Sequence, residues 1–393
     1  MQHFDVAIVG AGPAGAWAAH ELARRGAHVG LFDASHPREK PCGGGVTGRA
    51  FALVAAALRT HRASAAVVER ARFEASHSDG ASVALHAQGH GPNSSLLVFS
   101  RTTFDLALVR AAVDAGATWC AERVRDVEVS PDGVRLVTAA RTYRSDFVIG
   151  ADGANSLVRR RVAKPFARHQ LSFTTGVFAH GLSASEIIIR FVPKPQGYIW
   201  SFPRPDHLAI GIGAQADETK PDPLRRILAD WIAETRLADG ARMESYSWPI
   251  PSLNATDLAE ERPSGPRWLL VGDAGGLADP MTREGIYFAL RSGELAAEAL
   301  AAADGPRRYH RALAAEIYPE IEHASRWKRG LFTGPFIHLL VHALQRSHRV
   351  RTIMCDLVAG QQPYRGLKRR LLRTCELRLA WQLVRIERSA QRT

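Results

Sequence analysis

Short apolar runs that end in glycine or aspartate mark the N-terminal part of the chain. Residues 4–10 (FDVAIVG) and 27–33 (AHVGLFD) are two such runs, and the alanine-rich residues 13–25 between them stop before Gly26. A short continuous apolar run is typical of a buried parallel strand, and glycine commonly follows the last residue of a helix. The pattern predicts one complete β-α-β unit.

Further helices and strands are predicted up to about residue 150. Helices are expected over about 49–59 and 101–115, and weak alternation predicts strands within 67–100. Two strands joined by a tight turn are expected within 123–139, and the apolar residues 147–150 predict another buried strand.

The pattern changes between about residues 170 and 255. Aromatic residues, prolines and alternating positions there predict an antiparallel sheet, interrupted by one helix near 222–235. A buried strand at 267–272 and a helix over 284–303 then return, and the remainder to residue 393 is expected to be mostly helical.

A glycine motif lies at the first turn of the predicted β-α-β unit. Gly10, Gly12 and Gly15 form G-x-G-x-x-G between strand and helix, and Asp33 ends the second strand. Such a turn brings the backbone and the helix N-terminus close to a pyrophosphate. An aspartate at the end of the second strand is expected to accept hydrogen bonds from the adenosine ribose and to disfavour a 2′-phosphate. The site is therefore expected to hold FAD or NAD.

Two later segments favour FAD. Residues 149–154 (IGADGA) and 270–275 (LVGDAG) each place an aspartate just after a buried strand. With G-x-G-x-x-G before them, in this order, they resemble the flavoprotein superfamily that contains para-hydroxybenzoate hydroxylase. The resemblance spans about residues 4–300. It implies that Asp273 reaches the ribityl chain, and that Asp152 and Arg101 lie toward the pyrophosphate.

The resemblance implies an α/β fold: a Rossmann-like FAD-binding domain, an inserted antiparallel-sheet substrate domain and a helical C-terminal region. The implied boundaries are 1–70, 100–165 and 265–303 for the FAD-binding domain, 71–99 and 166–264 for the substrate domain, and 304–393 for the helical region. The residues implied at the cofactor are Gly10, Gly12, Pro13, Ala14, Gly15, Asp33, Cys42, Gly43, Gly44, Arg101, Val124, Asp152, Gly153, Gly272, Asp273, Gly285 and Ile286. The helix from 284 onward is expected to aim its positive N-terminus at the flavin ring, where it would stabilise the reduced form.

Two motifs resemble the geranylgeranyl reductase family within this superfamily. They are residues 40–46 (KPCGGGV) and 195–203 (PQGYIWSFP), the second followed by residues 211–213 (GIG). Residues 272–297 resemble the same family, except that Arg283 stands where glycine is more usual. The resemblance implies reduction of isoprenoid C=C bonds by hydride transfer from reduced FAD.

The second motif also predicts an aromatic wall. Tyr198, Trp200 and Phe202 alternate, so on a strand their side chains point to one face. Pro203 and the two glycines at 211 and 213 (Gly211 and Gly213) are expected to leave room for a long ligand. These six residues are the predicted substrate-binding residues, and the wall suits a flat or polyene-like apolar substrate.

Cys42 is the predicted catalytic residue. An isolated alkene is a poor hydride acceptor, so a proton has to reach the other carbon before or with the hydride. The resemblance places the loop of Cys42 by the flavin, and an ordinary thiol is protonated at neutral pH. Tyr198 and Trp200 are expected to stabilise the developing cation through their ring faces. An inert loop cysteine is the alternative interpretation.

Two other functions stay open at this point. A flavin monooxygenase or halogenase would use the same FAD motifs, although the W-x-W-x-I-P signature of halogenases is absent. A flavin-binding carrier of an apolar isoprenoid would bind both ligands without reoxidation of the flavin. NADPH or a ferredoxin-like protein is the expected electron donor, since the sequence contains no second nucleotide motif.

Charge and composition add partner expectations. The net charge is +12, and much of the excess lies within 365–392, where the predicted helix 366–388 has an apolar stripe. This helix either packs on its own domain or lies on an anionic membrane surface. No nucleic-acid motif accompanies the charge, and the scattered cysteines, together with His338 and His342, predict no metal site. Without a long apolar run or a leader, a cytoplasmic protein, with peripheral membrane contact through this helix, is expected.

Overall fold

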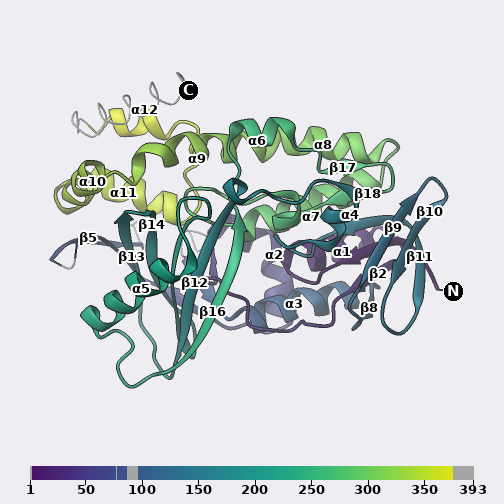
Figure 1. The fold of residues 1–393 in the computed structure, drawn as a ribbon, viewed down its shortest axis with the longest axis horizontal. Coiled ribbons are helices and arrows are strands. Elements are labelled where there is room, and N and C mark those ends of the chain that lie inside the picture. Colours follow the sequence, from purple (N-terminus) through teal and green to yellow (C-terminus); the bar gives the residue numbers. More distant parts are fainter. Residues whose placement is uncertain (1, 77, 86–95, 375–393) are drawn as a thin grey trace.

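The computed structural model describes residues 2–76, 78–85 and 96–374 (Figure 1). In this part of the chain, three sheets form, and helices cover them on several sides. This arrangement matches the predicted fold class, a mixed α/β fold with a parallel β-α-β sheet and a large antiparallel sheet. The predicted division into domains stays a prediction.

The first sheet contains the N-terminal β-α-β unit. Its main path runs β17-β18-β11-β1-β2-β8, and β1 pairs in parallel with both β2 and β11. The hairpin of β9 and β10 joins the edge of β11 in antiparallel orientation. The bounds are β1 (His3–Val9), β2 (Val29–Phe32), β8 (Thr118–Cys120), β9 (Asp126–Ser130), β10 (Gly133–Val137), β11 (Thr142–Gly150), β17 (Ser264–Gly265) and β18 (Trp268–Leu270).

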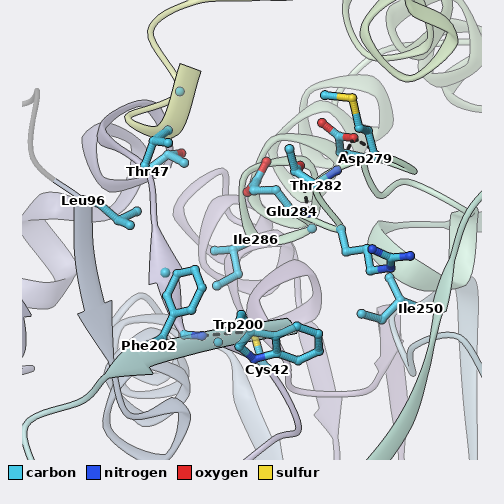
Figure 2. A pocket seen from close by; sticks show the side chains of 18 of the residues that line it. Cys42, Thr47, Leu96, Trp200, Phe202, Ile250, Asp279, Thr282, Glu284 and Ile286 are labelled. Carbon is cyan, nitrogen blue, oxygen red and sulfur yellow. Dashed lines mark hydrogen bonds between the residues drawn. The ribbon is translucent and has the colours of Figure 1, made fainter. Parts of the chain in front are cut away.

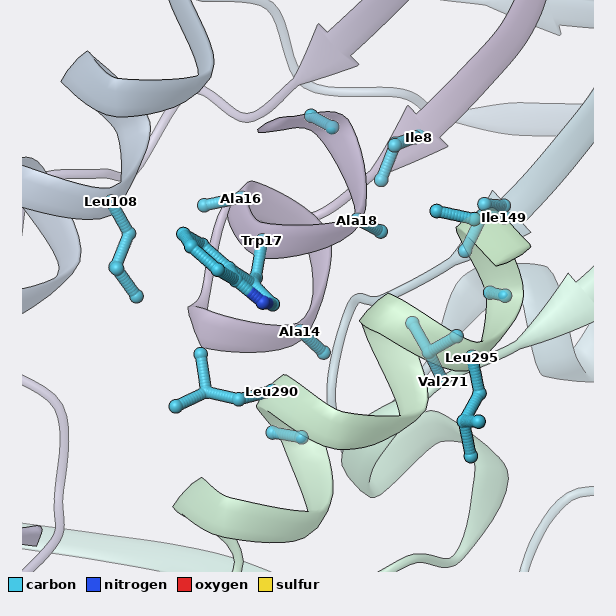
Figure 3. Close-up of a cluster of buried hydrophobic side chains, with 14 of the residues drawn as sticks. Ile8, Ala14, Ala16, Trp17, Ala18, Leu108, Ile149, Val271, Leu290 and Leu295 are labelled. Atoms are coloured by element: carbon cyan, nitrogen blue, oxygen red, sulfur yellow. The ribbon is translucent and has the colours of Figure 1, made fainter. Parts of the chain in front are cut away.

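Small residues let the helices beside this sheet pack closely against one another. Helix α1 (Pro13–Arg24) lies between α3 (Arg101–Asp114) and α7 (Ile286–Leu300), and Figure 3 shows Trp17 among Leu108 and Leu290. A Cβ at Gly293 of α7 would lie 2.6 Å from the carbonyl oxygen of Ala14. Close packing of α7 on α1 thus depends on glycine and alanine. It fixes the N-termini of both helices beside the ends of β1 and β18.

The second sheet is mainly antiparallel and has two different faces. Its order is β16-β12-β15-β14-β13-β5-β6. Helix α5 (Pro221–Thr235) covers one face through the cluster that contains Ile199, Ile210 and Trp231, and the other face carries Trp200. The bounds are β5 (Arg70–Ser76), β6 (Asp79–Ala84), β12 (Leu171–His180), β13 (Glu186–Pro193), β14 (Gln196–Pro203), β15 (His207–Gln215) and β16 (Arg242–Pro251).

A small third sheet lies between these parts. It consists of β3 (Gly45–Val46), β7 (Leu96–Phe99) and β4 (Ala65–Val68), in the order β3-β7-β4. The expected substrate segment 71–99 is thus shared between two sheets. Its first strands, β5 and β6, join the large antiparallel sheet, whereas β7 pairs next to the loop of Cys42.

The C-terminal helices pack on the second sheet (Figure 1). Helix α10 contacts β5 and β6, α11 contacts β6, and Phe332 and Phe336 share a buried cluster with Phe73 and Phe191. The remaining bounds are α2 (Gly48–Thr60), α4 (Leu157–Val162), α6 (Ala255–Glu260), α8 (Gly305–Glu316), α9 (Tyr318–Leu331), α10 (Gly334–Arg346), α11 (His348–Val358) and α12 (Leu367–Leu372), with short 3-10 turns at Arg168–Gln170 and Gly272–Gly275 (η3). No helix of the described residues is long and apolar enough to cross a bilayer. Most of the predicted basic helix 366–388 lies outside the described residues.

Candidate functional site

A cavity of about 330 Å³ connects the turn before α1 with the aromatic face of the second sheet. Figure 2 shows Cys42, Trp200 and Phe202 on one side of it, and Asp279, Thr282 and Glu284 on the opposite side. Ile286, the first residue of α7, lies between the two groups. The cavity therefore brings both predicted motifs, residues 40–46 and 195–203, to one place.

The three motif glycines have three different roles in the turn. Gly10 has a φ of 102°, and a Cβ there would lie 2.4 Å from the carbonyl oxygen of Ala151. A Cβ at Gly15 would lie 1.9 Å from the carbonyl oxygen of Gly10, so Gly15 permits the approach of α1. At Gly12 a Cβ would meet no protein atom within 4 Å, and Gly12 lines the cavity with Pro13 and Ala14. The turn therefore leaves open space next to the backbone of Gly12, as binding of a pyrophosphate requires.

Asp33 is hydrogen-bonded by the protein itself. Its Oδ2 accepts from the Ala11 N–H at 3.0 Å and lies 2.7 Å from His36 Nδ1, and its Oδ1 accepts from the N–H and the hydroxyl of Ser35 at 2.7 Å each. These contacts use about four acceptor positions, the usual capacity of a carboxylate. The ribose contact predicted for Asp33 stays a prediction, and it requires one of these partners to move.

His36 joins Asp33 to a buried ion pair. Its Nε2 lies 3.2 Å from Asp105 Oδ2, and Asp105 accepts two hydrogen bonds of 2.8 Å from Arg101. Burial lowers the pKa of His36, but the carboxylates of Asp105 and Asp33 outweigh it and raise the pKa. The sequence motifs pointed to Asp33 and Arg101 only; the i to i+4 spacing of Arg101 and Asp105 is the signal that could have revealed their pairing.

The second aspartate of the superfamily pattern caps a helix. Asp152 Oδ2 accepts from the backbone N–H groups of Leu157 (2.6 Å) and Val158 (3.2 Å) at the start of α4, and its other oxygen accepts from the Ser156 hydroxyl. Burial raises the pKa of Asp152. Its carboxylate is thus engaged by α4, whereas the neighbouring Gly153 lines the cavity.

Asp273 and the start of α7 complete the expected cofactor side. Asp273 lines the cavity, and its Oδ2 lies 3.2 Å from Lys40 Nζ. Gly272 has a φ of 55°, and Gly285 precedes the first turn of α7. Gly285 and Ile286 line the cavity, as expected for a helix whose N-terminus faces a ligand. Val124 is different, because its side chain is buried in the cluster with Phe4 and Phe32 on the sheet.

An arginine that the motifs did not reveal holds the loop of Cys42. Arg204 is fully buried, and its guanidinium donates hydrogen bonds to the carbonyl oxygens of Cys42 and Gly43 and pairs with Glu39. Glu39 in turn accepts from the Ser100 hydroxyl at 2.7 Å and from the Arg101 N–H at 2.9 Å, which caps α3. No local pattern marked Arg204, because it lies in the turn between β14 and β15, about 160 residues from the loop of Cys42 in sequence.

Replacing Arg204 with methionine is expected to free this loop. Loss of one partner of a buried ion pair typically costs about 3–5 kcal/mol. Arg204→Met is therefore expected to lower the melting temperature and to weaken FAD binding, measured by thermal denaturation and by flavin content. The double variant Arg204→Met with Glu39→Gln is expected to recover part of the stability, because it leaves no unpaired carboxylate. Equal stability of Arg204→Met and the unaltered chain would contradict the assignment.

Cys42 lines the cavity at the end of this loop. Its Sγ accepts a hydrogen bond of 3.3 Å from the Gly44 N–H, and Gly44 has a φ of 84° that favours glycine. A Cβ at Gly43 or Gly45 would press on the Phe202 ring at 3.0–3.1 Å. The three glycines therefore let the loop pass between Arg204 and the aromatic wall, with the thiol at the cavity.

Tyr198, Trp200 and Phe202 all line the cavity, as their alternation predicts. Gly211 and Gly213, which were predicted to leave room for a ligand, instead lie against protein side chains. A Cβ at Gly211 would lie 2.4 Å from the Trp200 ring, and one at Gly213 would lie 3.1 Å from the Arg283 guanidinium. Neither glycine, nor Pro203, is among the described residues that line the cavity. The glycines thus make room for protein side chains, not directly for a ligand.

The segments after α8 supply a large apolar part of the lining, which no sequence motif indicated. Their contribution is Leu331, Phe332, Leu340, Met354, Leu357, Val358 and Tyr364. Phe332 stacks on Tyr198 with ring centroids 6.4 Å apart, and the Gly48 N–H donates to the Ala359 carbonyl oxygen at 3.0 Å. The region after α7 is therefore part of the site.

The sequence matches a family model described as FAD binding domain over residues 3–305, more than half of the chain. A menaquinone reductase of Mycolicibacterium smegmatis is 30% identical over 319 residues, which cover 75% of this chain and 75% of the relative. The chain belongs to the geranylgeranyl reductase family of FAD-dependent oxidoreductases.

Other relatives agree with this family. A chloroplastic geranylgeranyl diphosphate reductase of Oryza sativa is 29% identical over 327 residues, covering 77% of this chain and 68% of the relative. The crystal structure of a geranylgeranyl bacteriochlorophyll reductase-like protein of Thermoplasma acidophilum has a TM-score of 0.76 at 20% identity, and covers 95% of this chain and 100% of that one. That likeness supports the fold.

The residues present fit the FAD of this reductase family. The turn at Gly12 leaves open space where a pyrophosphate needs it, and the first turn of α1 carries no acidic side chain that would repel phosphate. Asp273 and the start of α7 lie along the same cavity. Gly12, Pro13 and Ala14 would hold the pyrophosphate, and Asp273 the ribityl side.

Proposed function

We propose that this chain is an FAD-dependent reductase that saturates C=C bonds of a geranylgeranyl-type isoprenoid chain. The observation that carries the proposal is that one continuous cavity has a lining that passes from the G-x-G-x-x-G turn to apolar side chains of β5, β13, β14, α10 and α11. A long hydrocarbon chain fits such a lining better than a polar substrate does. The name of the Oryza sativa relative, a geranylgeranyl diphosphate reductase, supports this substrate class, whereas the name of the menaquinone reductase gives a different substrate.

The proposed chemistry divides between the cofactor and the chain. FAD, when bound and reduced, supplies the hydride to one carbon of the double bond. The Cys42 thiol donates a proton to the other carbon, and the ring face of Trp200 stabilises the positive charge that develops. The Tyr198 ring, which the alternation also suggested for this role, already has the Phe332 ring and the Arg283 guanidinium beside it. The apolar side chains of the C-terminal helices exclude water from this carbon.

The electron source and the surroundings of the protein are further parts of the proposal. NADPH or a ferredoxin-like protein reduces the flavin between turnovers. The basic segment after α12 brings the protein to an anionic membrane surface, where an isoprenoid lipid is available. Both parts are independent of the chemistry at the cavity.

An anaerobic half-reaction tests the proposed function. The purified flavoprotein is reduced with dithionite, geranylgeranyl diphosphate is added, and the absorbance of oxidised flavin is followed. Its return, together with a product heavier by two hydrogens in mass spectrometry, is the expected result. Flavin that stays reduced until air is admitted, followed by oxygen consumption that depends on added substrate, would instead indicate an oxygen-using enzyme of the same fold.

A further inference from the structure

Arg283 is a buried cation whose guanidinium has no hydrogen-bond acceptor at bonding distance among the described residues. It lies in the turn between η3 and α7, with a φ of 59° that a side chain rarely adopts. Only 8% of the residue is exposed, and it lines the cavity. Its three guanidinium nitrogens are buried without a hydrogen-bond partner among the described residues. Both the backbone strain and the desolvated charge are costly, so they need a compensating use.

Two residues of the second sheet fix the position of the Arg283 side chain. Its Nε and Cδ would lie 3.1 and 3.2 Å from a Cβ at Gly213, so only the missing side chain of that glycine leaves room. On another side its guanidinium carbon lies 4.9 Å from the centroid of the Tyr198 ring. The guanidinium is therefore fixed next to the aromatic wall by two residues of adjacent strands, β14 and β15.

A second cation, Lys328 of α9, lies close by. Its Nζ donates to Gln215 Oε1 and, at 2.9 Å, to the Ser252 hydroxyl, both neutral oxygens. Burial, and then the charge of Arg283, lower the pKa of Lys328 to about 7. Among the described residues neither Lys328 nor Arg283 forms an ion pair, although the charges of Glu218, Asp217 and Asp279 act on Lys328 and raise its pKa in part. Gln215 follows Gly213 by two residues on β15, so the points at which the two side chains contact this strand lie on one face, about 7 Å apart. Arg283 lines the cavity, and Lys328 lies behind it, outside the described lining.

We propose that Arg283 and Lys328 form a subsite for an oxyanion, a carboxylate or a phosphate, at the end of the substrate's apolar chain. This inference rests on the proposed function and adds the class of head group to it. A buried guanidinium without a hydrogen-bond partner among the described residues, with a second basic group near it, favours a charged group over an alcohol, since charge-assisted hydrogen bonds are the strong ones. Tyr198, Thr174, Trp248 and Ile250 line the cavity beside this subsite, so the chain attached to the anion remains among apolar side chains.

Binding to the oxidised holoenzyme tests the subsite by calorimetry, without turnover. The probes are geranylgeranoic acid, geranylgeranyl monophosphate and geranylgeraniol, together with palmitic acid and 1-hexadecanol. The unaltered enzyme is expected to bind at least one class of anion about tenfold or more tightly than the matching alcohol. Arg283→Gly, which also relieves the backbone strain, is expected to abolish this preference while the affinity for the alcohols stays unchanged. The carboxylate and phosphate arms then identify the head group.

Arg62→Gly is the matched control, because Arg62 also has a positive φ (52°) but is exposed on the surface. It is expected to keep the preference for the anion. Lys328→Met is expected to reduce the preference in part. Equal affinity of the unaltered enzyme for acid and alcohol, or no binding of any anion, would overturn the subsite. So would an Arg283→Gly variant that keeps the preference but binds FAD less tightly, because the guanidinium would then serve the flavin. If only the proposed function is wrong, the enzyme would still bind the anion more tightly than the alcohol, but the substrate would not reoxidise the reduced flavin in the anaerobic half-reaction.

Discussion

A Gly12→Ala variant is expected to fold normally and to be purified without FAD. A Cβ at Gly12 meets no protein atom within 4 Å, so the methyl group disturbs no packing. It does occupy the space in which the backbone of the turn would approach the pyrophosphate. Loss of one or two hydrogen bonds to a charged group, at about 1.5–3 kcal/mol each, corresponds to a loss in FAD affinity of about tenfold to ten-thousandfold. The measurement is flavin content after purification, followed by titration of the apoprotein with FAD.

Two other glycine variants separate binding from folding. Gly15→Ala places a methyl group 1.9 Å from the Gly10 carbonyl oxygen, so it is expected to disrupt the packing of α1 and to give unstable protein. Gly334→Ala adds a methyl group where no atom lies within 4 Å, away from the G-x-G-x-x-G turn. This variant is expected to change neither the FAD content nor the stability. Full FAD content in Gly12→Ala would contradict the assignment of this turn to the pyrophosphate.

The parts of the site that could be predicted from the sequence are those that local sequence specifies. A turn between a buried strand and a helix needs glycine at Gly10 and Gly15 for steric reasons that hold in any such unit. The alternation of Tyr198, Trp200 and Phe202 likewise follows from strand geometry alone. Each of these features depends on a few residues that are close in sequence, so the sequence pattern was sufficient to predict it.

The parts that could not be predicted depend on contacts between distant segments. The pairing of Arg204 with Glu39 joins residues 165 positions apart, and no local pattern marks either of them. The position of Gly213 next to Arg283 depends on how the turn before α7 meets β15. The sequence suggested that the glycine leaves room for a ligand, whereas the room is taken by an arginine side chain. The helices after α7 show amphipathic patterns, but nothing in them specified that they line the cavity.

A Cys42→Ser variant is expected to retain FAD and to reduce substrate about a hundredfold to ten-thousandfold more slowly, the usual range for loss of a general acid. Serine has nearly the same shape and can accept the same hydrogen bond from the Gly44 N–H, so the loop is expected to stay in place. A hydroxyl group is a much weaker acid than a thiol, so the proton would arrive more slowly. The measurement is the rate at which substrate reoxidises prereduced flavin in a single anaerobic turnover, which removes the electron donor from the rate.

Cys120→Ala is the matched control for this experiment. Cys120 is buried in the cluster with Phe32 and Tyr143 on the first sheet, and it is not among the described residues that line the cavity. Its replacement can lower stability but is expected to leave the rate of reoxidation unchanged. A Cys42→Ser variant with bound FAD and an unchanged rate would exclude the thiol as the acid. The search for the proton donor would then turn to Glu284, which lines the cavity and whose pKa is raised by burial. A raised pKa keeps more of this carboxyl group protonated, as a proton donor requires, and Arg49 at 3.3 Å only partly opposes the shift.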